Sequence, residues 1–295
     1  MAFKQITIIG TGLIGGSFGM AVKAAERGIH IVGCDRPHIL ERAGKMGAID
    51  HGVEDPAAAV EGSNLILLAT PVGTIIDLLE RIGPVAGPAA LITDTGSTKQ
   101  EILNRAQAVF GAQAGHRFLG GHPMAGKEHS SIFSADPGLF CNAAWLLVRS
   151  GPQQDMRSGR IQEYQQLLES IGARVTEIGA DRHDLLCAWI SHLPQMISTA
   201  LAATLVDEFG DDPDLHAIGG RALREMTRIA SSPFSMWRDV AHTNSGNIER
   251  VLARMEQRLA HLRENLKTPE LREEFERANR FELPQPQTRH SQNKD

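Results

Sequence analysis

Two short segments of the sequence are rich in side chains that can do acid–base chemistry. Thr93–Lys99 reads Thr-Asp-Thr-Gly-Ser-Thr-Lys, and Gly120–Glu128 reads Gly-Gly-His-Pro-Met-Ala-Gly-Lys-Glu. An imidazole with an ordinary pKa of about 6.5 is suited to accept a hydroxyl proton near neutral pH, so His122 is the candidate base. The glycines before it give a substrate or cofactor room to approach. Ser97 is able to hydrogen-bond His122 or a substrate hydroxyl; alternatively it is a helix N-cap, with Gln100 at the capping-box position.

A glycine-rich segment near the N-terminus has the spacing of a phosphate-binding loop. Gly10, Gly12 and Gly15 form a GxGxxG motif between an apolar run and a helix-compatible stretch. In such loops the glycines permit a tight turn, close approach of a pyrophosphate, and packing of the helix on the strand. Leu13 and Ile14 start the helix, whose free N–H groups face the anion. The segment predicts a dinucleotide site; the alternative is a glycine-rich turn that binds no nucleotide.

Further residues at the ends of apolar runs extend this predicted site. Asp35, twenty residues beyond Gly15, is placed to bind ribose hydroxyls and repel a 2′-phosphate, which favours NAD over NADP. Arg36 fits a 2′-phosphate instead, so NADP stays possible. Thr70 and Pro71 end another run where a dinucleotide crosses a sheet, unless the proline only terminates a strand. Thr95 and Gly96 directly follow a further apolar run, and we assign them to the cofactor site because of this position.

The elements that must position these residues are short buried strands. The apolar runs that predict them are Gln5–Gly10, Ile29–Cys34, Leu65–Ala69, Ala89–Asp94, Arg117–Gly121, Ala143–Val148 and Ala173–Ile178. Continuous apolar runs of this length are typical of strands that are buried on both faces. Because they alternate with helix-compatible stretches, they predict βαβ units and a mostly parallel α/β sheet of Rossmann type, with ligands at the carboxyl edge.

The second half of the chain predicts helices. From about residue 181 strand signals are almost absent, and Pro194 should kink or break the helix that contains it. A heptad-like stripe from Ile248 to Leu266 predicts a charged helix that packs on its own domain or against a second subunit. We expect domains at residues 1–179 and 180–284 and a loose tail at 285–295.

Arg228 lies on an apolar helix segment and needs a carboxylate partner, from the protein or from a ligand. His192 is either a satisfied core histidine or a ligand contact.

Composition excludes several classes of function. The 295 residues are 42% hydrophobic with a net charge of −5, which does not suit a nucleic-acid or anionic-membrane surface. Three cysteines without a CxxC pair argue against a disulfide framework or a zinc site, so we expect no metal. The first residues lack a signal-peptide pattern, and the longest apolar runs are too short to span a bilayer. We expect a cytoplasmic protein that interacts neither with nucleic acid nor with a membrane.

Taken in order along the chain, these motifs resemble those of the prephenate/arogenate dehydrogenases of tyrosine biosynthesis. The matching segments are Gly10–Ser17, Ala69–Val72, Thr93–Lys99, Gly120–Gly126 with Glu128, Ala188–Pro194, and Thr227–Ala230 with Met236–Asp239. The resemblance implies an N-terminal nucleotide-binding domain, an all-helical C-terminal domain that forms a homodimer, and an active site between them. It also implies oxidative decarboxylation of prephenate or arogenate with NAD(P).

The resemblance also implies roles for individual residues. His122 would accept the hydroxyl proton, Ser97 would be its hydrogen-bonding partner near the nicotinamide, and Arg228 would anchor a substrate carboxylate. Three further positions, Glu128, His192 and Gln195, would line the substrate pocket. Family members that favour prephenate often carry His where this chain has Gln195. A neutral amide is able to accept a hydrogen bond from the ammonium group of arogenate, so we expect arogenate to be accepted at least as well as prephenate.

Two alternative functions remain open from the sequence. One is another two-domain NAD(P) oxidoreductase, of the β-hydroxyacid dehydrogenase or imine reductase type, which shares the opening strand–GxGxxG–strand pattern. Such enzymes commonly rely on a helix-borne Lys or Asp rather than on a histidine like His122. The other is a non-enzymatic NAD-sensing protein, which would keep Gly10–Gly15 and Asp35 and turn over nothing.

Overall fold

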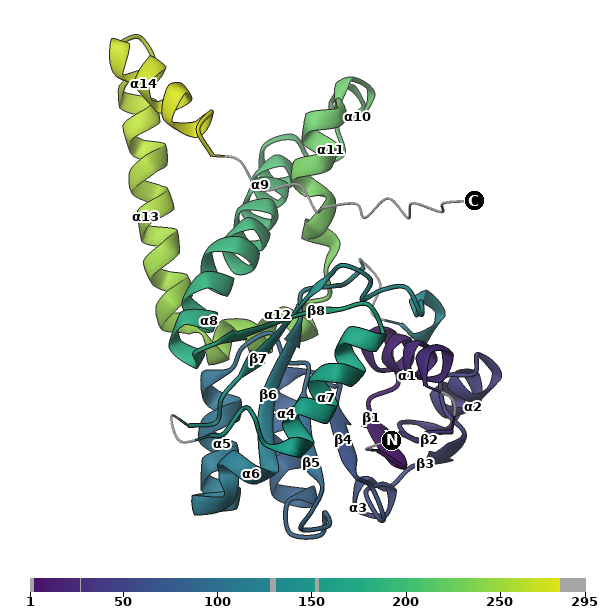
Figure 1. Cartoon of the computed structure of the whole chain (residues 1–295). Coiled ribbons are helices and arrows are strands. Elements are labelled where there is room, and N and C mark those ends of the chain that lie inside the picture. Colours follow the sequence, from purple (N-terminus) through teal and green to yellow (C-terminus); the bar gives the residue numbers. More distant parts are fainter. Residues whose placement is uncertain (1–2, 27, 128–130, 152–153, 282–295) are drawn as a thin grey trace, which may run out of the picture. The chain divides into compact units, whose positions relative to one another are not determined.

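The computed structural model describes residues 3–26, 28–127, 131–151 and 154–281 (Figure 1). The chain divides into two compact units, Met1–Ile248 and Glu249–Asp295. The predicted domain boundary after residue 179 falls inside the first unit and stays a prediction. The predicted tail at 285–295 lies outside the described residues.

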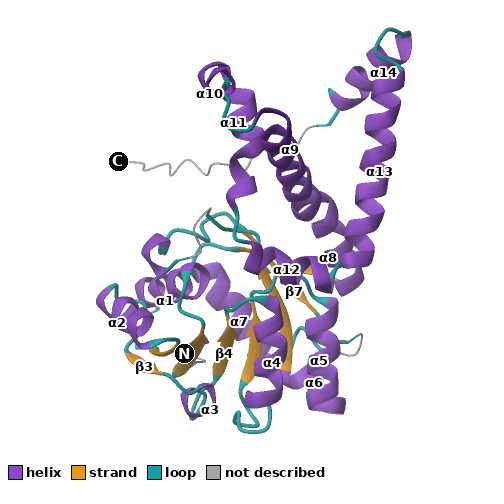
Figure 2. Ribbon diagram, turned by 180° about the vertical axis from the view of Figure 1, so that it is seen from behind, coloured by secondary structure: helices purple, strands orange, loops and turns teal. Residues whose placement is uncertain are grey.

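The first unit contains one large β-sheet. Its strands are β1 (Gln5–Ile9), β2 (His30–Cys34), β3 (His51–Val53), β4 (Leu65–Leu68), β5 (Leu91–Asp94), β6 (Phe118–Pro123), β7 (Ala144–Val148) and β8 (Arg174–Ile178). They follow the order β3-β2-β1-β4-β5-β6-β7-β8, and neighbours are parallel except for β6 and β7. Figure 2 draws the strands in orange and the helices in purple. The predicted α/β fold with a mostly parallel sheet is therefore confirmed. Strand order reverses between β1 and β4, which is where ligands bind in sheets of this kind.

All seven apolar runs form strands, with ends within two residues of the prediction. The strand that sequence reasoning missed is β3, which pairs with β2 at the edge of the sheet. Its residues His51 and Gly52 are exposed, so no apolar run marks it. An edge strand with one partner gives no continuous hydrophobic signal.

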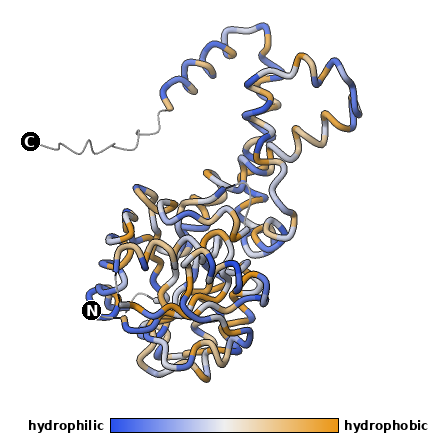
Figure 3. The backbone as a smooth tube through the Cα atoms, turned by 90° about the vertical axis from the view of Figure 1, so that its right-hand side faces the viewer, coloured by the Kyte–Doolittle hydropathy of each residue, from blue (hydrophilic) through white to orange (hydrophobic). Residues whose placement is uncertain are grey.

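Helices cover both faces of the sheet. One face packs on α1 (Leu13–Ala25), α2 (Pro37–Lys45) and α7 (Gly159–Ser170), and the other on α3 (Pro56–Ala59), α4 (Val72–Ile82) and α5 (Gln100–Phe110). Ile8 belongs to the first core and the next residue, Ile9, to the second. This alternation explains the continuous apolar runs, because successive side chains of a strand point to opposite faces. Figure 3 shows short hydrophobic (orange) stretches alternating with hydrophilic (blue) ones along the backbone. Short turns complete this half, namely η1 (Gly111–Gln113), α6 (Ala114–Arg117) and η2 (Ile132–Ser134).

The remaining elements are helical, as predicted. They are α8 (Ala180–Cys187), η3 (Ala188–His192), α9 (Leu193–Phe209), α10 (Pro213–Ile218), α11 (Arg221–Thr227), η4 (Arg228–Ser231), α12 (Phe234–Thr243), α13 (Ser245–Glu264) and α14 (Pro269–Ala278). Pro194 does not break the helix. A π-helical turn, η3, precedes it, and the proline lies in the first turn of α9. A wider turn at this point accommodates a residue that has no N–H to donate to the preceding turn.

The helical run Ala180–Phe209 is long and apolar enough to cross a membrane by length and composition alone, with a mean hydropathy of 1.2. Sequence reasoning expected no such segment because it considered only uninterrupted apolar runs. Core helices of soluble proteins meet the same criterion. This run contains His183, Asp184 and His192, each of which is at least 98% buried inside the protein, and ionisable groups with internal partners are not typical of a lipid-facing helix.

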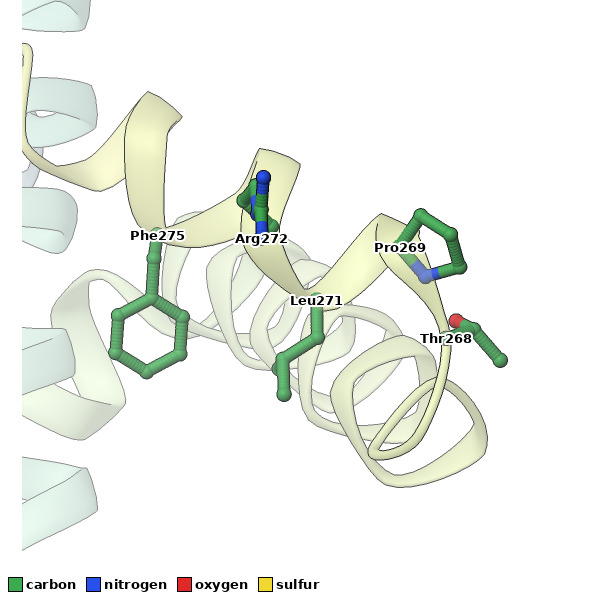
Figure 4. Close-up of a pocket in the computed structure, with 5 residues that line it drawn as sticks. All are labelled: Thr268, Pro269, Leu271, Arg272 and Phe275. Atoms are coloured by element: carbon green, nitrogen blue, oxygen red, sulfur yellow. The ribbon is translucent and has the colours of Figure 1, made fainter.

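The second unit is small and highly charged. It comprises most of α13, which is the predicted heptad helix, and α14. Glu274 of α14 accepts a hydrogen bond from Arg258 of α13 at 2.6 Å. Figure 4 shows Leu271 and Phe275, one turn apart on α14, beside an open hollow that Thr268, Pro269 and Arg272 also line. Phe275 is 62% exposed, so this unit leaves part of its apolar surface uncovered.

A buried ion pair holds the loop after β5 at the carboxyl edge of the sheet. Asp94, at the end of β5, pairs with Lys99, and neither side chain has any exposed surface. The other bonds of Asp94 come from the backbone N–H of Gly96 at 2.7 Å and of Gly121 at 3.0 Å. The carboxylate thus fixes the loop after β5 and the end of β6 at the same time.

We expect Lys99→Met to lower the free energy of unfolding by about 3–5 kcal/mol, because it leaves the Asp94 carboxylate buried without its cation. Urea denaturation followed by circular dichroism measures this loss. Lys45→Met is the matched control: Lys45 pairs with Glu41 on the surface, where both side chains are about two-thirds exposed, and such a pair contributes at most ~1 kcal/mol. Equal losses in the two variants would contradict a structural role for the buried pair.

Candidate active site

The glycine-rich loop between β1 and α1 is closely packed. Gly10 has a φ of +93°, which disfavours any other residue. A Cβ at Gly10 would lie 2.5 Å from the carbonyl oxygen of Ala69, and one at Gly15 would lie 2.0 Å from the carbonyl oxygen of Gly10. Larger side chains are therefore excluded where the turn meets β4 and where α1 packs on it. These are the roles that the sequence predicts for the first and third glycines.

The N-terminus of α1 is suited to hold an anion. The helix begins at Leu13 after Gly12, and no side chain caps its first turn. The first N–H groups of a helix, here including those of Leu13 and Ile14, have no partner within the helix. Together with the positive end of the helix dipole they form an anion site. The residues present therefore fit the pyrophosphate of a dinucleotide.

Asp35 lies beside this loop, at the end of β2. Its carboxylate accepts hydrogen bonds from the backbone N–H groups of Thr11 and Arg36, both at 2.8 Å. Its side chain is 19% exposed, whereas that of Arg36 is 75% exposed. The Thr11 hydroxyl donates a third hydrogen bond at 3.3 Å. A carboxylate has about four acceptor positions, so Asp35 retains acceptor capacity for a ribose hydroxyl. Arg36 extends into solvent with its Nε 3.9 Å from Asp35.

The other predicted cofactor residues lie on the adjacent strand ends. Thr70 packs against Gly10, and its Oγ1 is buried without a hydrogen-bond partner among the described residues. Pro71 is exposed and directly precedes α4. Two backbone groups in the next loop are already engaged, since Thr95 N–H donates to Leu68 and Gly96 N–H donates to Asp94. The structure thus groups these residues at the switch point of the sheet.

His122 lies within β6, next to its last residue, rather than in the loop after it. The sequence suggested that the glycines before His122 give a ligand room to approach, but the structure shows no such room. A Cβ at Gly121 would lie 2.4 Å from the backbone oxygen of Asp94, and one at Gly120 would lie 3.3 Å from the Lys99 side chain. The space is filled by β5 and the buried ion pair. The paired glycines therefore serve close packing behind the histidine.

A chain of hydrogen bonds leads from His122 into the helical half. His122 Nδ1 is 2.9 Å from His183 Nε2, and His183 Nδ1 is 2.8 Å from Asp184 Oδ1. Asp184 also accepts hydrogen bonds from the backbone N–H groups of Lys99 at 2.8 Å and Gln100 at 2.9 Å. It therefore caps α5, and the expectation that Ser97 is the N-cap is wrong. A residue 85 positions away takes that place.

The ionisation of this chain follows from burial and hydrogen bonding. Burial alone would raise the pKa of the Asp184 carboxyl, but hydrogen bonds from His183, Gln100 and Lys99 outweigh it and lower the pKa. Burial lowers the pKa of His183, against the opposing effect of Asp184. Burial holds the pKa of His122 well below its ordinary value, and the proximity of His183, Lys99 and His192, beside which a further positive charge is unfavourable, adds to this effect. At neutral pH the carboxyl is thus ionised and both imidazoles are neutral.

These charges determine the tautomers. An ionised Asp184 is able only to accept, so His183 carries its proton on Nδ1 and its Nε2 is a bare acceptor. His122 must then donate from Nδ1–H, which leaves its own Nε2 without a proton. The arrangement therefore prepares one nitrogen of His122 to accept a proton.

The ring of His192 is protonated on the other nitrogen: its Nδ1 accepts a hydrogen bond and its Nε2 carries the proton. Asn244 Nδ2 donates to His192 Nδ1 at 3.2 Å and to the backbone oxygen of Asp184 at 2.9 Å. Burial lowers the pKa of His192 to about 4, so the ring is neutral and carries its proton on Nε2. That atom is buried without a partner among the described residues, and the ring makes an edge contact with Trp237. A buried donor without a partner indicates that a ligand group completes it.

The remaining predicted site residues differ in their burial and in their contacts. Gln195 is buried, and its Nε2 donates to the backbone oxygen of Ile229 at 2.9 Å, which ties α9 to the segment that carries Arg228. Arg228 begins η4. Ser97 is half-buried, and its hydroxyl has no hydrogen-bond partner among the described residues, so the predicted bond to His122 is not present. Glu128 lies outside the described residues.

Sequence reasoning missed several residues that the structure brings to His122. His183 and Cys187 lie one turn apart on α8, and Cys187 Sγ is 3.6 Å from His183 Nε2 and 4.0 Å from His122 Nδ1. Burial raises the pKa of the Cys187 thiol to about 12. The spacing of four residues on a helix was a visible signal that His183 and Cys187 share a face. Nothing local links them to His122, because the contact joins segments 61 residues apart.

Comparison with known proteins identifies relatives that match most of the chain. Residues 18–177 match the family model "Prephenate dehydrogenase, nucleotide-binding domain", and residues 179–279 match "Prephenate dehydrogenase, dimerization domain". A prephenate dehydrogenase of Lactococcus lactis subsp. cremoris is 34% identical over 262 residues, which cover 88% of this chain and 70% of the relative.

Solved structures give the same result. The crystal structure of prephenate dehydrogenase from A. aeolicus in complex with hydroxyphenyl propionate and NAD+ has a TM-score of 0.83 at 28% identity, covering 94% of each chain. The structure of Synechocystis arogenate dehydrogenase has a TM-score of 0.75 at 27% identity, covering 93% of this chain and 97% of that chain.

We expect long-range 1H–15N NMR of the histidine rings to show His122 as the neutral Nδ1–H tautomer at pH 7. On acidification the ring should stay neutral well below pH 6.5, because burial and nearby positive charge disfavour the imidazolium. In Asp184→Ala, His183 loses the acceptor that fixes its proton, so His122 should become a mixture of tautomers. An Nε2–H tautomer in the unmodified protein would contradict the deduced hydrogen-bond polarity.

Proposed function

The chain belongs to the prephenate dehydrogenase family, and we propose that it catalyses NAD-dependent oxidative decarboxylation of prephenate, arogenate or both in tyrosine biosynthesis. This membership favours the dehydrogenase over the other oxidoreductases and the NAD sensor that the sequence left open. The observation that carries the proposal is the hydrogen-bond chain from His122 through His183 to Asp184, from which a bare Nε2 on His122 follows.

His122 is the base of the proposed reaction. Its Nε2 takes the proton of the substrate's ring hydroxyl as that oxygen becomes a carbonyl. When bound, the nicotinamide supplies the hydride acceptor for the carbon that carries this hydroxyl. The ring carboxylate then departs as carbon dioxide, its bonding electrons make the ring aromatic, and the phenolate oxygen takes the proton back from His122. The protonated His122 is stabilised through His183 by the negative charge of Asp184, which stays ionised throughout.

The helical half supplies the proposed contacts to the substrate. The Nε2–H of His192 is a buried donor without a partner among the described residues, which suits a substrate oxygen. Arg228 provides a positive charge for a carboxylate. Gln195 uses its Nε2 within the protein, and its Oε1 has no partner among the described residues, so it is free to accept from an ammonium group. Ser97 remains a proposed residue near the nicotinamide, without the predicted bond to His122, and Glu128 remains a proposed residue of the substrate pocket.

NAD is the proposed cofactor. The acceptor capacity of Asp35 beside the Gly10–Gly15 loop supports binding of an unphosphorylated ribose, and a relative of known structure was solved with NAD+. A 2′-phosphate next to this carboxylate would be repelled at short range. Arg36, which extends into solvent, leaves some binding of NADP open. Gly12, Leu13 and Ile14 would hold the pyrophosphate.

We also propose that the helical half forms a homodimer and that the enzyme is cytoplasmic. Residues 179–279 match a family model described as a dimerization domain. This stretch exposes large apolar side chains that a second copy would cover: Ile190, Val206, Phe209, Ile218, Met226, Leu259, Leu266 and Phe275. It also contains the apolar run 180–209, so a subunit contact accounts for that hydropathy without a membrane.

Reduction of NAD followed by absorbance, with prephenate and arogenate in parallel, tests the proposed activity. His122→Asn should lower kcat by about 10²–10⁴-fold, the usual contribution of a positioned base. In the unmodified enzyme kcat/KM should fall only below pH 6.5, as the neutral form of His122 is lost; the variant should lack this decline. NAD binding by the variant is the control for folding. Normal turnover by His122→Asn would contradict the assignment of the base.

Gln195→His should shift specificity toward prephenate. An imidazole that donates a proton suits the keto-carboxylate side chain of prephenate, whereas the amide oxygen of Gln195 suits the ammonium group of arogenate. The measurement is the ratio of kcat/KM values for the two substrates. Thr199→Val is the control, because Thr199 accepts from Gln195 Nε2 at 3.2 Å and its loss should leave the amide in place. A ratio unchanged in Gln195→His would contradict a role for this residue in substrate choice.

A further inference from the structure

Three side chains that can bind metals converge beneath the proposed base. His122 Nδ1 and His183 Nε2 are 2.9 Å apart, and Cys187 Sγ lies 3.6 Å from the second and 4.0 Å from the first. Among the described residues, His122, His183 and Cys187 are a group whose ligand atoms all lie within 4.8 Å of one another. His183 and Cys187 are 99–100% buried. The proposed reaction uses His122 Nε2 and gives the thiol no task.

The triangle formed by these atoms has the size of a metal site. Three points separated by 2.9, 3.6 and 4.0 Å lie on a circle with a radius of about 2.1 Å, where zinc–nitrogen bonds measure ~2.0–2.1 Å and zinc–sulfur bonds ~2.3 Å. An ion at or slightly above the centre of this circle would lie at about bonding distance from all three ligand atoms. Two imidazoles and one thiolate match the ligand preference of Zn²⁺, and three protein ligands leave a fourth position open.

The surroundings of His183 also suit a metal ligand. Histidines that bind zinc usually donate their other ring N–H to a carboxylate, which orients the ring. His183 Nδ1–H donates in this way to Asp184, and Asp184 is itself held by the backbone N–H groups of Lys99 and Gln100. The nitrogen that faces His122 and Cys187 is therefore the bare one. The negative charges of Asp184 and of a Cys187 thiolate would balance the two positive charges of the ion.

We propose that His122, His183 and Cys187 form an inhibitory Zn²⁺ site, and that the bound ion abolishes the activity of His122 as a base. The binding half of this proposal stands on geometry alone. The inhibitory half rests on the proposed function of His122. The site thereby couples the activity of the enzyme to the availability of a thiophilic divalent ion.

The proton balance explains the inhibition. In the metal-free state the proton on His122 Nδ1 bridges the two histidines and Nε2 is bare. When Zn²⁺ binds, both Nδ1 of His122 and Nε2 of His183 give their lone pairs to the ion, and the Cys187 thiol releases its proton to solvent. The proton that His122 held on Nδ1 moves to Nε2. A neutral imidazole protonated at Nε2 has no lone pair left to accept the substrate's hydroxyl proton, and nothing is oxidised or reduced.

Titration of the full-length protein with Co²⁺, a spectroscopic substitute for Zn²⁺, tests the binding half. We expect a thiolate-to-metal charge-transfer band and the visible bands of a tetrahedral site, all of which Zn²⁺ should bleach by displacing Co²⁺. Cys187→Ser and Cys187→Ala should lose the charge-transfer band and weaken binding more than about tenfold, the lower limit for loss of even an outer-shell partner. Cys34→Ser and Cys141→Ser are matched controls, one buried and one exposed, and should keep the band.

Absence of the band in the unmodified protein, or its persistence in both Cys187 variants, would overturn the proposed site. These readouts need no turnover, so they remain decisive even if the proposed dehydrogenase activity fails. Asp184→Asn should weaken Co²⁺ binding by about 10–100-fold through loss of the outer-shell contact. Unchanged affinity in this variant would contradict the assigned role of His183 as an oriented ligand.

Inhibition of NAD reduction by Zn²⁺ tests the second half, with each variant compared with its own metal-free rate. The unmodified enzyme should lose activity over the Zn²⁺ range in which Co²⁺ is displaced, and a chelator should restore it. Cys187→Ser should require at least about tenfold more Zn²⁺ for the same inhibition, whereas Cys34→Ser should not. Full activity of the Zn²⁺-loaded enzyme would overturn the inhibitory role, and equal sensitivity of Cys187→Ser would assign the inhibition to another site.

Discussion

The buried ion pair between Asp94 and Lys99 is the constraint on which the geometry of the site depends. Each of these charges, if unpaired at this depth, would carry a desolvation penalty of several kcal/mol, so the two side chains remain together as long as the fold persists. Asp94 also binds the backbone of Gly96 and Gly121, which sets the end of β6 and therefore the position of His122. The backbone of Lys99 binds Asp184, which connects the same point to α8. One pair thus locates both ends of the hydrogen-bond chain through which His122 is oriented.

The same burial that locates the histidines also keeps them neutral. His122, His183 and His192 all have lowered pKa values, and burial is the largest cause for each. A base with a low pKa is a weak proton acceptor, but it is present in the correct form over a wide pH range. Weak basicity is sufficient here because loss of hydride turns the substrate's hydroxyl into a far stronger acid, and aromatisation drives the overall reaction. The protein therefore gains more from fixing the direction of the acceptor lone pair than from raising its basicity.

Most of the fold was predictable because the strands are buried on both faces and leave continuous apolar runs in the sequence. Their carboxyl ends share an edge, so the Gly10–Gly15 loop and His122 were identified from strand position alone. What sequence reasoning missed or misread depends on contacts between distant segments. Asp184 caps α5 from 85 positions away and displaces Ser97 from that role, and β5 fills the space beside Gly121 that was assigned to a ligand. The spacing of residues within one segment of the sequence does not reveal such contacts.

The rule that cysteines without a CxxC pair argue against zinc takes no account of such contacts, so it does not exclude the proposed site. It examines neighbours in sequence, whereas the ligands here come from β6 and from two positions one turn apart on α8. Asp184 already holds the outer nitrogen of His183 and directs its bare nitrogen toward His122 and Cys187, as a metal ligand requires, whereas His122 must first shift its proton from Nδ1 to Nε2. Preparation of His122 as a base and susceptibility to Zn²⁺ are thus consequences of one arrangement. Cys187 makes the site susceptible to Zn²⁺, because its thiol supplies the third ligand that the two histidines alone would lack.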